Sequence, residues 1–455
     1  MEGKVSFRRT LSLHHVVLFG LAYMAPMIVF GIYGVIAQTT HGLEASAYLV
    51  ALVAMFFTAY SYGQMVRAYP VSGSAYTYTR KSLNSHVGFM VGWAILLDYL
   101  FIPMAIWLIG GSYLNAAFPA VPIWGWVLAF IVITTAINIY GIKLSVNVNV
   151  LMMVFQFLVI ALFIILSVRS VLGGTGAGTL FSFSPFVNHS GSFSFVLAGA
   201  AIACYSFLGF DAITTLTEET KNPEKTIPTA ILLVTVIGGG IFIVASYVTQ
   251  LVHPNFLSFH DVNSAAFEIA REIGGALFSS IFLAGIIVAQ FASGISAQAS
   301  ASRLLYAMGR DSVLPNRVFG YLSPRFRTPV YNIVIVGIVG LLALALSVST
   351  STSFINFGAF MGFTLVNLSV IGHYFVKNRR RTARETLLFL ILPLLGAGFD
   401  FWLLVNLDKD ALRLGISWAV VGLIYLTFLT KAFRKRPPEM SLDVIETELE
   451  LELDA

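Results

Sequence analysis

Long, continuous runs of apolar residues limit the fold of this chain more than any other feature of its sequence. About 20 such residues in a helix cross the roughly 30 Å of hydrocarbon in a lipid bilayer, and runs of this length recur along most of the chain. A membrane β-barrel would instead show short segments in which apolar and polar residues alternate. The chain is therefore predicted to be an all-α integral membrane protein.

Twelve membrane-spanning helices are predicted from these runs. Their expected positions are 15–39, 45–68, 86–112, 123–141, 147–170, 195–217, 228–251, 276–304, 329–349, 353–376, 385–406 and 411–432. Of the 455 residues, 57% are hydrophobic and only 11% are charged. This balance is typical of a membrane domain and excludes a soluble one.

The distribution of Lys and Arg predicts the orientation in the membrane. Cytoplasmic loops of membrane proteins are enriched in these residues. With the N-terminus inside, 23 of the 27 Lys and Arg fall on the cytoplasmic side. The four that fall outside are Arg169, Arg271, Lys409 and Arg413. This asymmetry predicts that both termini are cytoplasmic, and it accounts for the net charge of +5 without a nucleic-acid partner.

The predicted organisation is one membrane domain without a soluble module. Residues 1–14 form a cytoplasmic N-terminus, residues 15–376 a ten-helix core, residues 385–433 helices eleven and twelve, and residues 434–455 an acidic cytoplasmic tail. Within the core, two five-helix halves are expected at about 15–170 and 195–376. Cys204 is the only cysteine, which excludes intrachain disulfides and cysteine-built metal sites. No cofactor or metal is expected.

Two of the predicted spans are interrupted at their centres. The first has Pro26 in mid-run, and proline removes a backbone donor and clashes with the preceding turn. The sixth has Ser206 and Gly209 in mid-run, followed directly by Asp211. Taken singly, the proline is explained by a kink and the glycine by close packing of a neighbouring helix. Paired breaks in corresponding positions of two halves instead mark the binding site of inverted-repeat transporters.

Three long motifs resemble the amino acid–polyamine–organocation transporter family. They are "SFLGFDAITTLTEETKNPEKTIPTAI" (206–231), "SRLLYAMGRDSVLPNRVFGYLSPRFRTPVYNI" (302–333) and "YPVSGSAYTYTRKSLNSHVGFMVGW" (69–93). The resemblance covers all twelve predicted spans. Within the family, segments such as "GLAYMAPM", "LLDYLF" and "FSFSPF" are most similar to bacterial putrescine importers. The resemblance implies location in the bacterial inner membrane.

This resemblance implies a LeuT-type fold with a 5+5 inverted repeat, two additional C-terminal helices and alternating access. It also implies a substrate held between spans one, three, six and eight. Tyr205 falls at the position of a gating aromatic residue in relatives, Tyr99 at a substrate-facing position, and Asp211 at an acidic position after the break. The predicted substrate-binding residues are Tyr23, Met24, Ala25, Pro26, Asp98, Tyr99, Tyr205, Ser206, Phe207, Gly209, Phe210 and Asp211.

The residues at the breaks favour a substrate without a carboxylate. Family members that bind amino acids usually have a Gly/Ser-rich break in span one, where free N–H groups hold the α-carboxylate. This chain has Met24, Ala25, Pro26 and Met27 there, and proline donates no hydrogen bond. Putrescine, with an ammonium group at each end, fits such a site better than an amino acid. Uptake of an amino acid by a permease or exchanger of the same family stays the alternative.

Two acids in the predicted core, Asp98 and Asp211, suit a diamine and are also the candidates for proton coupling. Intramembrane ionisable residues mark functional sites by default. An ion pair at 4 Å with an effective dielectric constant near 20 gains roughly 4 kcal/mol before desolvation. Cation–π contacts would each add about 0.5–2 kcal/mol, and the candidate aromatic residues are Tyr23, Tyr99, Tyr205, Phe207 and Phe210. A purely structural pairing stays open for either acid.

Span five and the absence of enzyme motifs bear on the coupling ion and on the class of function. Gln156 occupies the place where some relatives have a lysine and sodium-driven relatives a sodium ion, and glutamine carries no titrating charge. Coupling to the proton motive force is predicted, while sodium coupling and exchange stay open. The sequence shows no H-E-x-x-H, Gly-x-Ser-x-Gly or P-loop motif, so a transporter and not an enzyme is predicted.

Overall fold

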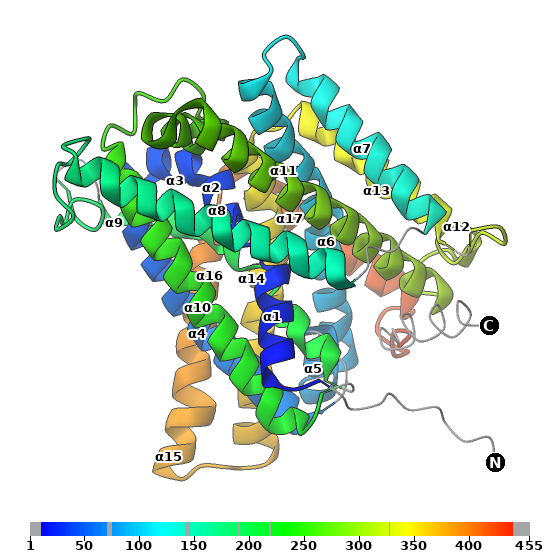
Figure 1. Cartoon of the computed structure of the whole chain (residues 1–455). Helices are drawn as coiled ribbons and strands as arrows, with labels where there is room; N and C mark the ends of the chain where they lie inside the picture. Colours follow the sequence, from blue (N-terminus) through cyan, green and yellow to red (C-terminus); the bar gives the residue numbers. More distant parts are fainter. Residues whose placement is uncertain are drawn as a thin grey trace.

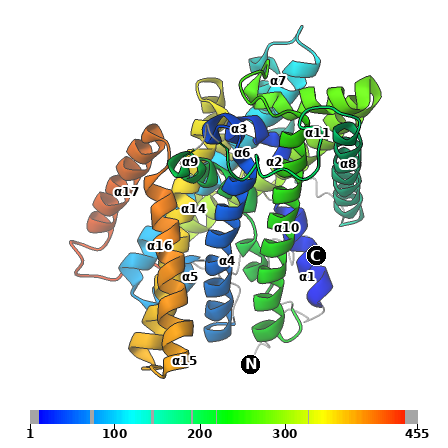
Figure 2. The same ribbon diagram turned by 90° about the vertical axis from the view of Figure 1, so that its left-hand side faces the viewer.

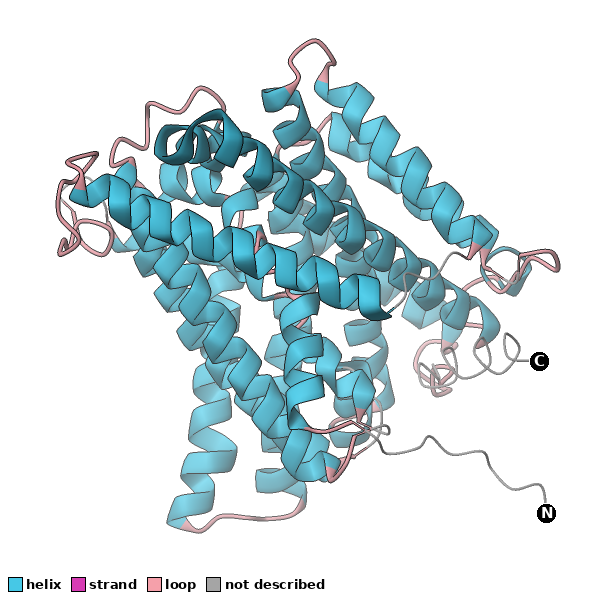
Figure 3. Ribbon diagram, in the orientation of Figure 1, coloured by secondary structure: helices cyan, strands magenta, loops and turns pink. Residues whose placement is uncertain are grey.

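The chain is helical throughout the part that the computed structural model describes. That part comprises residues 11–70, 75–141, 146–188, 192–217, 220–326 and 328–439, with the backbone alone for residues 146–150. Within these ranges there is no β-strand, and short loops join the helices (Figure 3). The predicted all-α fold is therefore confirmed.

Helices are labelled α, and 3-10 or π segments η, in chain order. The elements up to residue 172 are α1 (Leu13–Tyr23), α2 (Ile28–Gly31), α3 (Tyr33–Thr40), α4 (Glu44–Ala68), α5 (Ala75–Ser82), α6 (Ser85–Ala117), α7 (Ile123–Tyr140) and α8 (Val146–Leu172). The following elements are α9 (Phe193–Ala203), η1 (Cys204–Phe207), η2 (Asp211–Leu216), α10 (Pro223–Val252), η3 (Val262–Ser264), α11 (Ala265–Arg310), α12 (Asn316–Phe319), α13 (Val330–Gly340), η4 (Leu341–Leu344), α14 (Val348–Val370), η5 (Ile371–Lys377), α15 (Ala383–Thr386), η6 (Leu387–Ile391), α16 (Leu392–Val405) and α17 (Lys409–Leu429).

Eleven helices of the described chain are long and apolar enough to cross a membrane. The predicted count of twelve is not confirmed, because the ninth span, expected at 329–349, is the shorter helix Val330–Leu344. Its last turn tightens into the 3-10 segment η4, and the Ser347 hydroxyl then accepts a hydrogen bond from the Thr350 amide at 3.1 Å and starts α14. At 1.5 Å per α-helical residue and 2.0 Å per 3-10 residue, α13 and η4 together span only about 25 Å.

Local signals in the sequence set where several helices begin and end. The Asn84 side chain accepts a hydrogen bond from the Val87 amide at 2.9 Å and caps α6. Pro223 opens α10 at its first position, where a missing N–H costs nothing. Gly141 ends α7 with a φ of 68°, in the left-handed region that favours glycine.

The long helices pack side by side around the first and sixth spans. Helix α4 packs against both α10 and α16, and the three lie next to one another in Figures 1 and 2. Helices α7 and α13 lie together along one edge (Figure 1). In the second view, α16 and α17 lie on one side of the molecule and α8 on the other (Figure 2). Helix α6 packs against α11 and α14, and α1 packs against α10 and η2.

Candidate functional site

The first span is broken between α1 and α2. Helix α1 ends at Tyr23, and α2 begins at Ile28. Between them Ala25 has a φ of 47°, in the left-handed region that residues other than glycine rarely adopt. The Ala25 amide donates to the Ala22 carbonyl at 3.2 Å, and the Ile28 amide donates to the Ala25 carbonyl at 2.8 Å. The break predicted around Pro26 is therefore present, and its backbone groups bond to one another.

The sixth span is broken between η1 and η2. The α-helix α9 ends at Ala203, and the chain continues as two 3-10 segments separated by Leu208, Gly209 and Phe210. Gly209 has a φ of 104°, and a Cβ at this position would lie 2.3 Å from the Tyr23 ring. Only glycine suits both the backbone conformation and the close approach to Tyr23. The two broken spans thus meet at their breaks.

A cavity of about 280 Å³ lies where the two breaks meet. Eight of the predicted binding residues line it: Tyr23, Met24, Ala25, Asp98, Tyr99, Tyr205, Gly209 and Asp211. On α1, the lining residues Phe19 and Tyr23 are exposed, whereas Met27 and Phe30 beyond the break are buried. The cavity therefore opens toward the side of the molecule at which α1 begins.

The other four predicted residues do not line this cavity, and the 3-10 geometry of the sixth span explains why. Ser206 is buried, and its hydroxyl lies 3.1 Å from the Tyr48 hydroxyl. Phe207 packs on Phe242, with ring centroids 5.3 Å apart. In a 3-10 helix, side chains three residues apart lie above one another, so Tyr205 and Leu208 share the cavity face while Ser206 and Phe207 point elsewhere.

Phe210 and Pro26 are the remaining two. The Phe210 ring packs between Tyr62 and Phe363, at centroid distances of 5.8 and 5.3 Å. Pro26 is buried at the break and shapes the backbone without facing the cavity. Both residues therefore support the walls of the cavity.

The two predicted acids reach the cavity from different helices. Asp98 comes from α6 and Asp211 from the start of η2, and both side chains line the same cavity. The Tyr62 hydroxyl donates to Asp211 Oδ2 at 3.5 Å. Asp98 Oδ1 is buried and has no hydrogen-bond partner among the described residues.

Neither acid forms an ion pair with a Lys, Arg or His of the described chain. Two carboxyl groups therefore share one cavity without a cation from the protein. Such a site can bind an organic cation, a proton or both.

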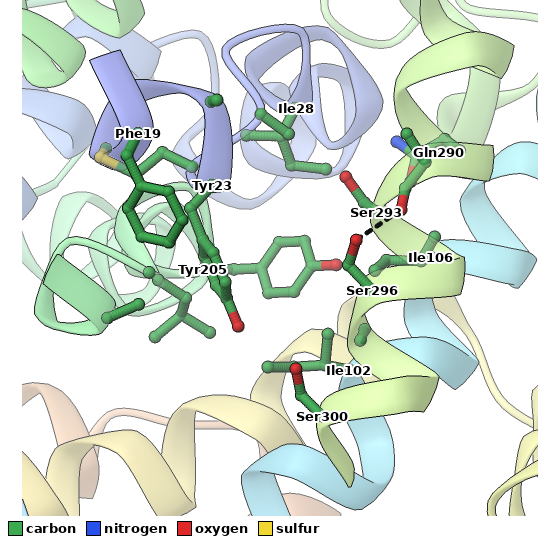
Figure 4. A pocket seen from close by; sticks show the side chains of 18 of the residues that line it. Phe19, Tyr23, Ile28, Ile102, Ile106, Tyr205, Gln290, Ser293, Ser296 and Ser300 are labelled. Atoms are coloured by element: carbon green, nitrogen blue, oxygen red, sulfur yellow. Dashed lines mark hydrogen bonds between the residues drawn. The ribbon is translucent and has the colours of Figure 1, made fainter. Parts of the chain in front are cut away.

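A polar and uncharged part of the lining comes from α11, and none of its residues is among the predicted binding residues. Figure 4 shows Gln290, Ser293, Ser296 and Ser300 on one face of α11, with the ring of Tyr205 directed toward this face. The Ser296 hydroxyl donates to the Ala292 carbonyl at 3.0 Å. The three serines are spaced three and four residues apart, the spacing of one helix face. That spacing within the predicted eighth span was the signal that could have identified them.

Apolar and amide side chains complete the lining. These further residues are Phe19, Ala22, Ile28, Ile102, Ile106, Met152, Met153, Gln156, Leu208, Ala212, Ala292, Ala297 and Phe363. Gln156 is buried, and its Oε1 atom has no hydrogen-bond partner in the described part of the chain. No cluster of three or more His, Cys, Asp or Glu residues that could hold a metal ion occurs in the described ranges.

Comparisons with known proteins agree with the resemblance found in the motifs. A model of the family described as "Amino acid permease" matches residues 15–406. The chain is 44% identical over 438 residues to the low-affinity putrescine importer PlaP of Escherichia coli (strain K12), covering 96% of this chain and 97% of that protein.

The names of more distant relatives give other substrates. The methylthioribose transporter of Bacillus subtilis (strain 168) is 27% identical over 94% of both chains. The branched-chain amino acid permease BcaP of the same organism is 26% identical over 93% of both chains. All three relatives are transporters or permeases, so the prediction of a transporter and not an enzyme is confirmed.

Proposed function

The chain belongs to the amino acid permease family, and from this premise we propose that it imports a small diamine, putrescine in first place, as a secondary active transporter. The observation that carries the proposal is the pair of buried carboxyl groups, Asp98 and Asp211, in a cavity between two broken helices. Contacts with the two carboxylates compensate an ammonium group for part of the hydration that it loses on entering the protein.

Aromatic and apolar side chains suit the rest of such a molecule. Tyr23, Tyr99 and Tyr205 present ring faces to the cavity, and Ile102 and Ile106 on α6 provide an apolar surface for the methylene chain. Cation–π contacts with tyrosine contribute about 0.5–2 kcal/mol each. The cavity thus combines negative charge for the ends of a diamine with apolar walls for its middle.

The breaks offer a poor site for a substrate carboxylate. In the first span, the amides of Met24 and Ala25 already donate to Gly20 and Ala22, and Pro26 has no N–H. In the sixth span, the Phe210 amide donates to the Phe207 carbonyl at 3.3 Å and the Ala212 amide to the Gly209 carbonyl at 3.1 Å. An α-carboxylate would therefore compete with the chain's own bonds and approach two acids of like charge.

We propose alternating access between the halves 15–170 and 195–376, with helices eleven and twelve outside this core. The location proposed is the bacterial plasma membrane with both termini cytoplasmic, in line with the Lys and Arg distribution. In that orientation the cavity opens toward the cytoplasm, because it opens on the side where α1 begins. Uptake is driven by the proton motive force, with Asp98 and Asp211 as proton-binding candidates.

A competition experiment tests the proposed substrate. Purified protein in liposomes is given radiolabelled putrescine, with an inside-negative membrane potential and an inward proton gradient applied separately. Unlabelled diamines, longer polyamines and amino acids are then added in ten-fold excess. Putrescine accumulation that diamines suppress and amino acids leave within two-fold supports the proposal.

Transport of a neutral or cationic amino acid is the second candidate. The serine face of α11, together with Gln290, can hydrogen-bond a polar group of such a substrate. The same set of competitors distinguishes a diamine transporter from an amino acid transporter. Strong competition by alanine, leucine or arginine, with none by putrescine, would replace the diamine proposal with this one.

A further inference from the structure

A second buried acid lies outside the cavity, on the accessory helix α16. Asp400 is 0% exposed and sits in a polar cluster that joins α4, α14 and α16. Its Oδ2 atom accepts hydrogen bonds from Thr58 Oγ1 at 2.8 Å and from Asn367 Nδ2 at 2.9 Å. The Ser61 hydroxyl donates to Asn367 Oδ1 at 2.5 Å and completes the cluster.

The packing around the cluster is specific to these polar groups. A Cβ at Gly396, one turn before Asp400 on α16, would lie 2.5 Å from Asn367 Oδ1. Glycine at this position therefore gives the asparagine side chain the room to reach Asp400. Asp400 Oδ1, the other carboxyl oxygen, is buried with no hydrogen-bond partner among the described residues.

The charge of Asp400 is not balanced by the protein. No Lys, Arg or His of the described ranges forms an ion pair with it. An unpaired charge in the membrane interior costs several kcal/mol, and such acids in transporters take part in proton transfer. Asn367 Nδ2 points a partly positive hydrogen at Oδ2, which opposes a metal cation there. A proton on Oδ1 neutralises the group without displacing any of these bonds.

Tyr62 connects this cluster to the substrate cavity. It lies on α4, next to Ser61 and one turn from Thr58, and its hydroxyl donates to Asp211 Oδ2 at 3.5 Å. On α14, Asn367 lies one turn from Phe363, which lines the cavity. The second acid is therefore within electrostatic reach of the first, through buried side chains.

We propose that Asp400 is a proton-binding site linked to the substrate site at Asp211. The inference rests on the proposed transport of an organic cation. A proton on Asp400 and an ammonium group at Asp211 both add positive charge to one low-dielectric region, so each weakens binding of the other. Such coupling is reciprocal, so substrate binding promotes loss of the Asp400 proton.

Few other titratable groups face Asp400. On α4, the titratable residue nearest the cluster is Tyr62, and at the junction of η1 with α9, which packs against α16, it is the buried, neutral thiol of Cys204. Asp211 lies beyond Tyr62. The side chain of α14 that contacts Asp400 is the neutral Asn367, and η6 is made of Leu387–Ile391 without a titratable residue. A change in pH dependence on replacing Asp400 can therefore be assigned to it.

Equilibrium binding of radiolabelled putrescine to the purified full-length protein between pH 5.5 and 8.5 tests the proposal. Each proton released per bound substrate raises the affinity ten-fold per pH unit. We expect D400N to bind putrescine. Its affinity should rise with pH less steeply than that of the wild type, by a factor of at least three per pH unit. D400E keeps the acid and is expected to retain the wild-type pH dependence.

Serine 61 provides the matched control. Ser61→Ala removes one hydrogen bond of the cluster and leaves the carboxyl group in place, so its pH dependence should match the wild type. If D400N does not elute as a single folded species, Asp400→Ser takes its place, since its hydroxyl still offers Thr58 and Asn367 a partner. Fewer protons released on substrate addition to the Asp400 variant, measured in weak buffer, would be the second supporting result.

The outcomes separate this inference from the proposed function. Equal pH dependence of D400N and the wild type overturns the role of Asp400 and leaves the diamine proposal intact. Loss of all binding in folded D400N also overturns it, because the residue would then be needed for the site itself. A wild-type protein that binds no putrescine at any pH overturns both.

Discussion

The two breaks that face each other in the membrane differ in charge and in backbone strain. The first is uncharged, and a non-glycine residue, Ala25, takes the left-handed conformation there with a φ of 47°. The second has glycine where φ is positive, at Gly209, and carries the acid Asp211 directly after it. The first break therefore shapes the cavity, while the second also supplies the charge that selects what can enter.

This difference between the two breaks indicates that broken helices alone do not define the substrate. Both breaks interrupt a membrane helix, and irregular backbone at this depth survives only where it is buried or lines a cavity. The side chains beside the break decide the chemistry of the site. Four substitutions test this contrast, and they are described from the largest expected effect to the smallest.

Replacing Asp211 with Asn should have the largest effect, because it removes the charge of the second break and keeps its shape. We expect putrescine uptake into liposomes to fall at least ten-fold. Asp410→Asn is the matched control, since Asp410 is exposed at the start of α17, far along the chain from the cavity lining. Uptake by D211N within two-fold of the wild type would assign Asp211 to structure.

Gly209→Ala should have the next largest effect. The added Cβ would lie 2.3 Å from the Tyr23 ring, and a φ of 104° is strained for alanine. Strain of this kind costs about 1–3 kcal/mol, so we expect uptake to fall about five-fold and the unfolding temperature to drop. Gly240→Ala on α10, where a Cβ meets nothing within 4 Å, is the control. A fully active G209A variant would show that the breaks move apart easily.

Ser206→Ala tests the prediction that this residue supports the second break without contacting substrate. The change removes the 3.1 Å hydrogen bond to Tyr48. A buried hydrogen bond contributes about 1 kcal/mol, so we expect lower thermal stability and uptake within two-fold. Tyr48→Phe removes the same bond from the other side and should match it. A five-fold rise in the substrate concentration for half-maximal uptake would instead place Ser206 in the site.

Ala25→Gly should have the smallest effect. It should raise the unfolding temperature, whereas Gly209→Ala should lower it. Glycine relieves the left-handed strain of about 1–2 kcal/mol and loses about 0.5–1 kcal/mol through chain entropy. We expect a small rise in unfolding temperature and uptake within two-fold. Ala37→Gly, within α3, is the control and should lower stability. A fall in stability for A25G would mean that the first break is not strained.

Much of the fold followed from local sequence. Apolar runs of about 20 residues fix helices in a bilayer because each residue adds its own transfer free energy. Pro26 and Gly209 mark the breaks because their backbone properties act at their own positions. Local sequence did not predict the early end of the α-helix in the ninth span. Its last turn tightens at Leu341–Leu344, and that segment contains no proline or glycine.

The two acids of the cavity, Asp98 on α6 and Asp211 after the second break, could be selected from the sequence, because charge in a membrane helix is rare enough to stand out. Which side chains face the cavity could not, since a 3-10 helix turns each residue by about 120° where an α-helix turns it by about 100°. Only the tertiary structure joined Thr58 to Asp400 across 342 positions of the chain and brought the serines of α11 into one cavity with the two acids. Contacts between distant helices depend on how the helices pack, and that packing is a property of the whole molecule that no single span contains.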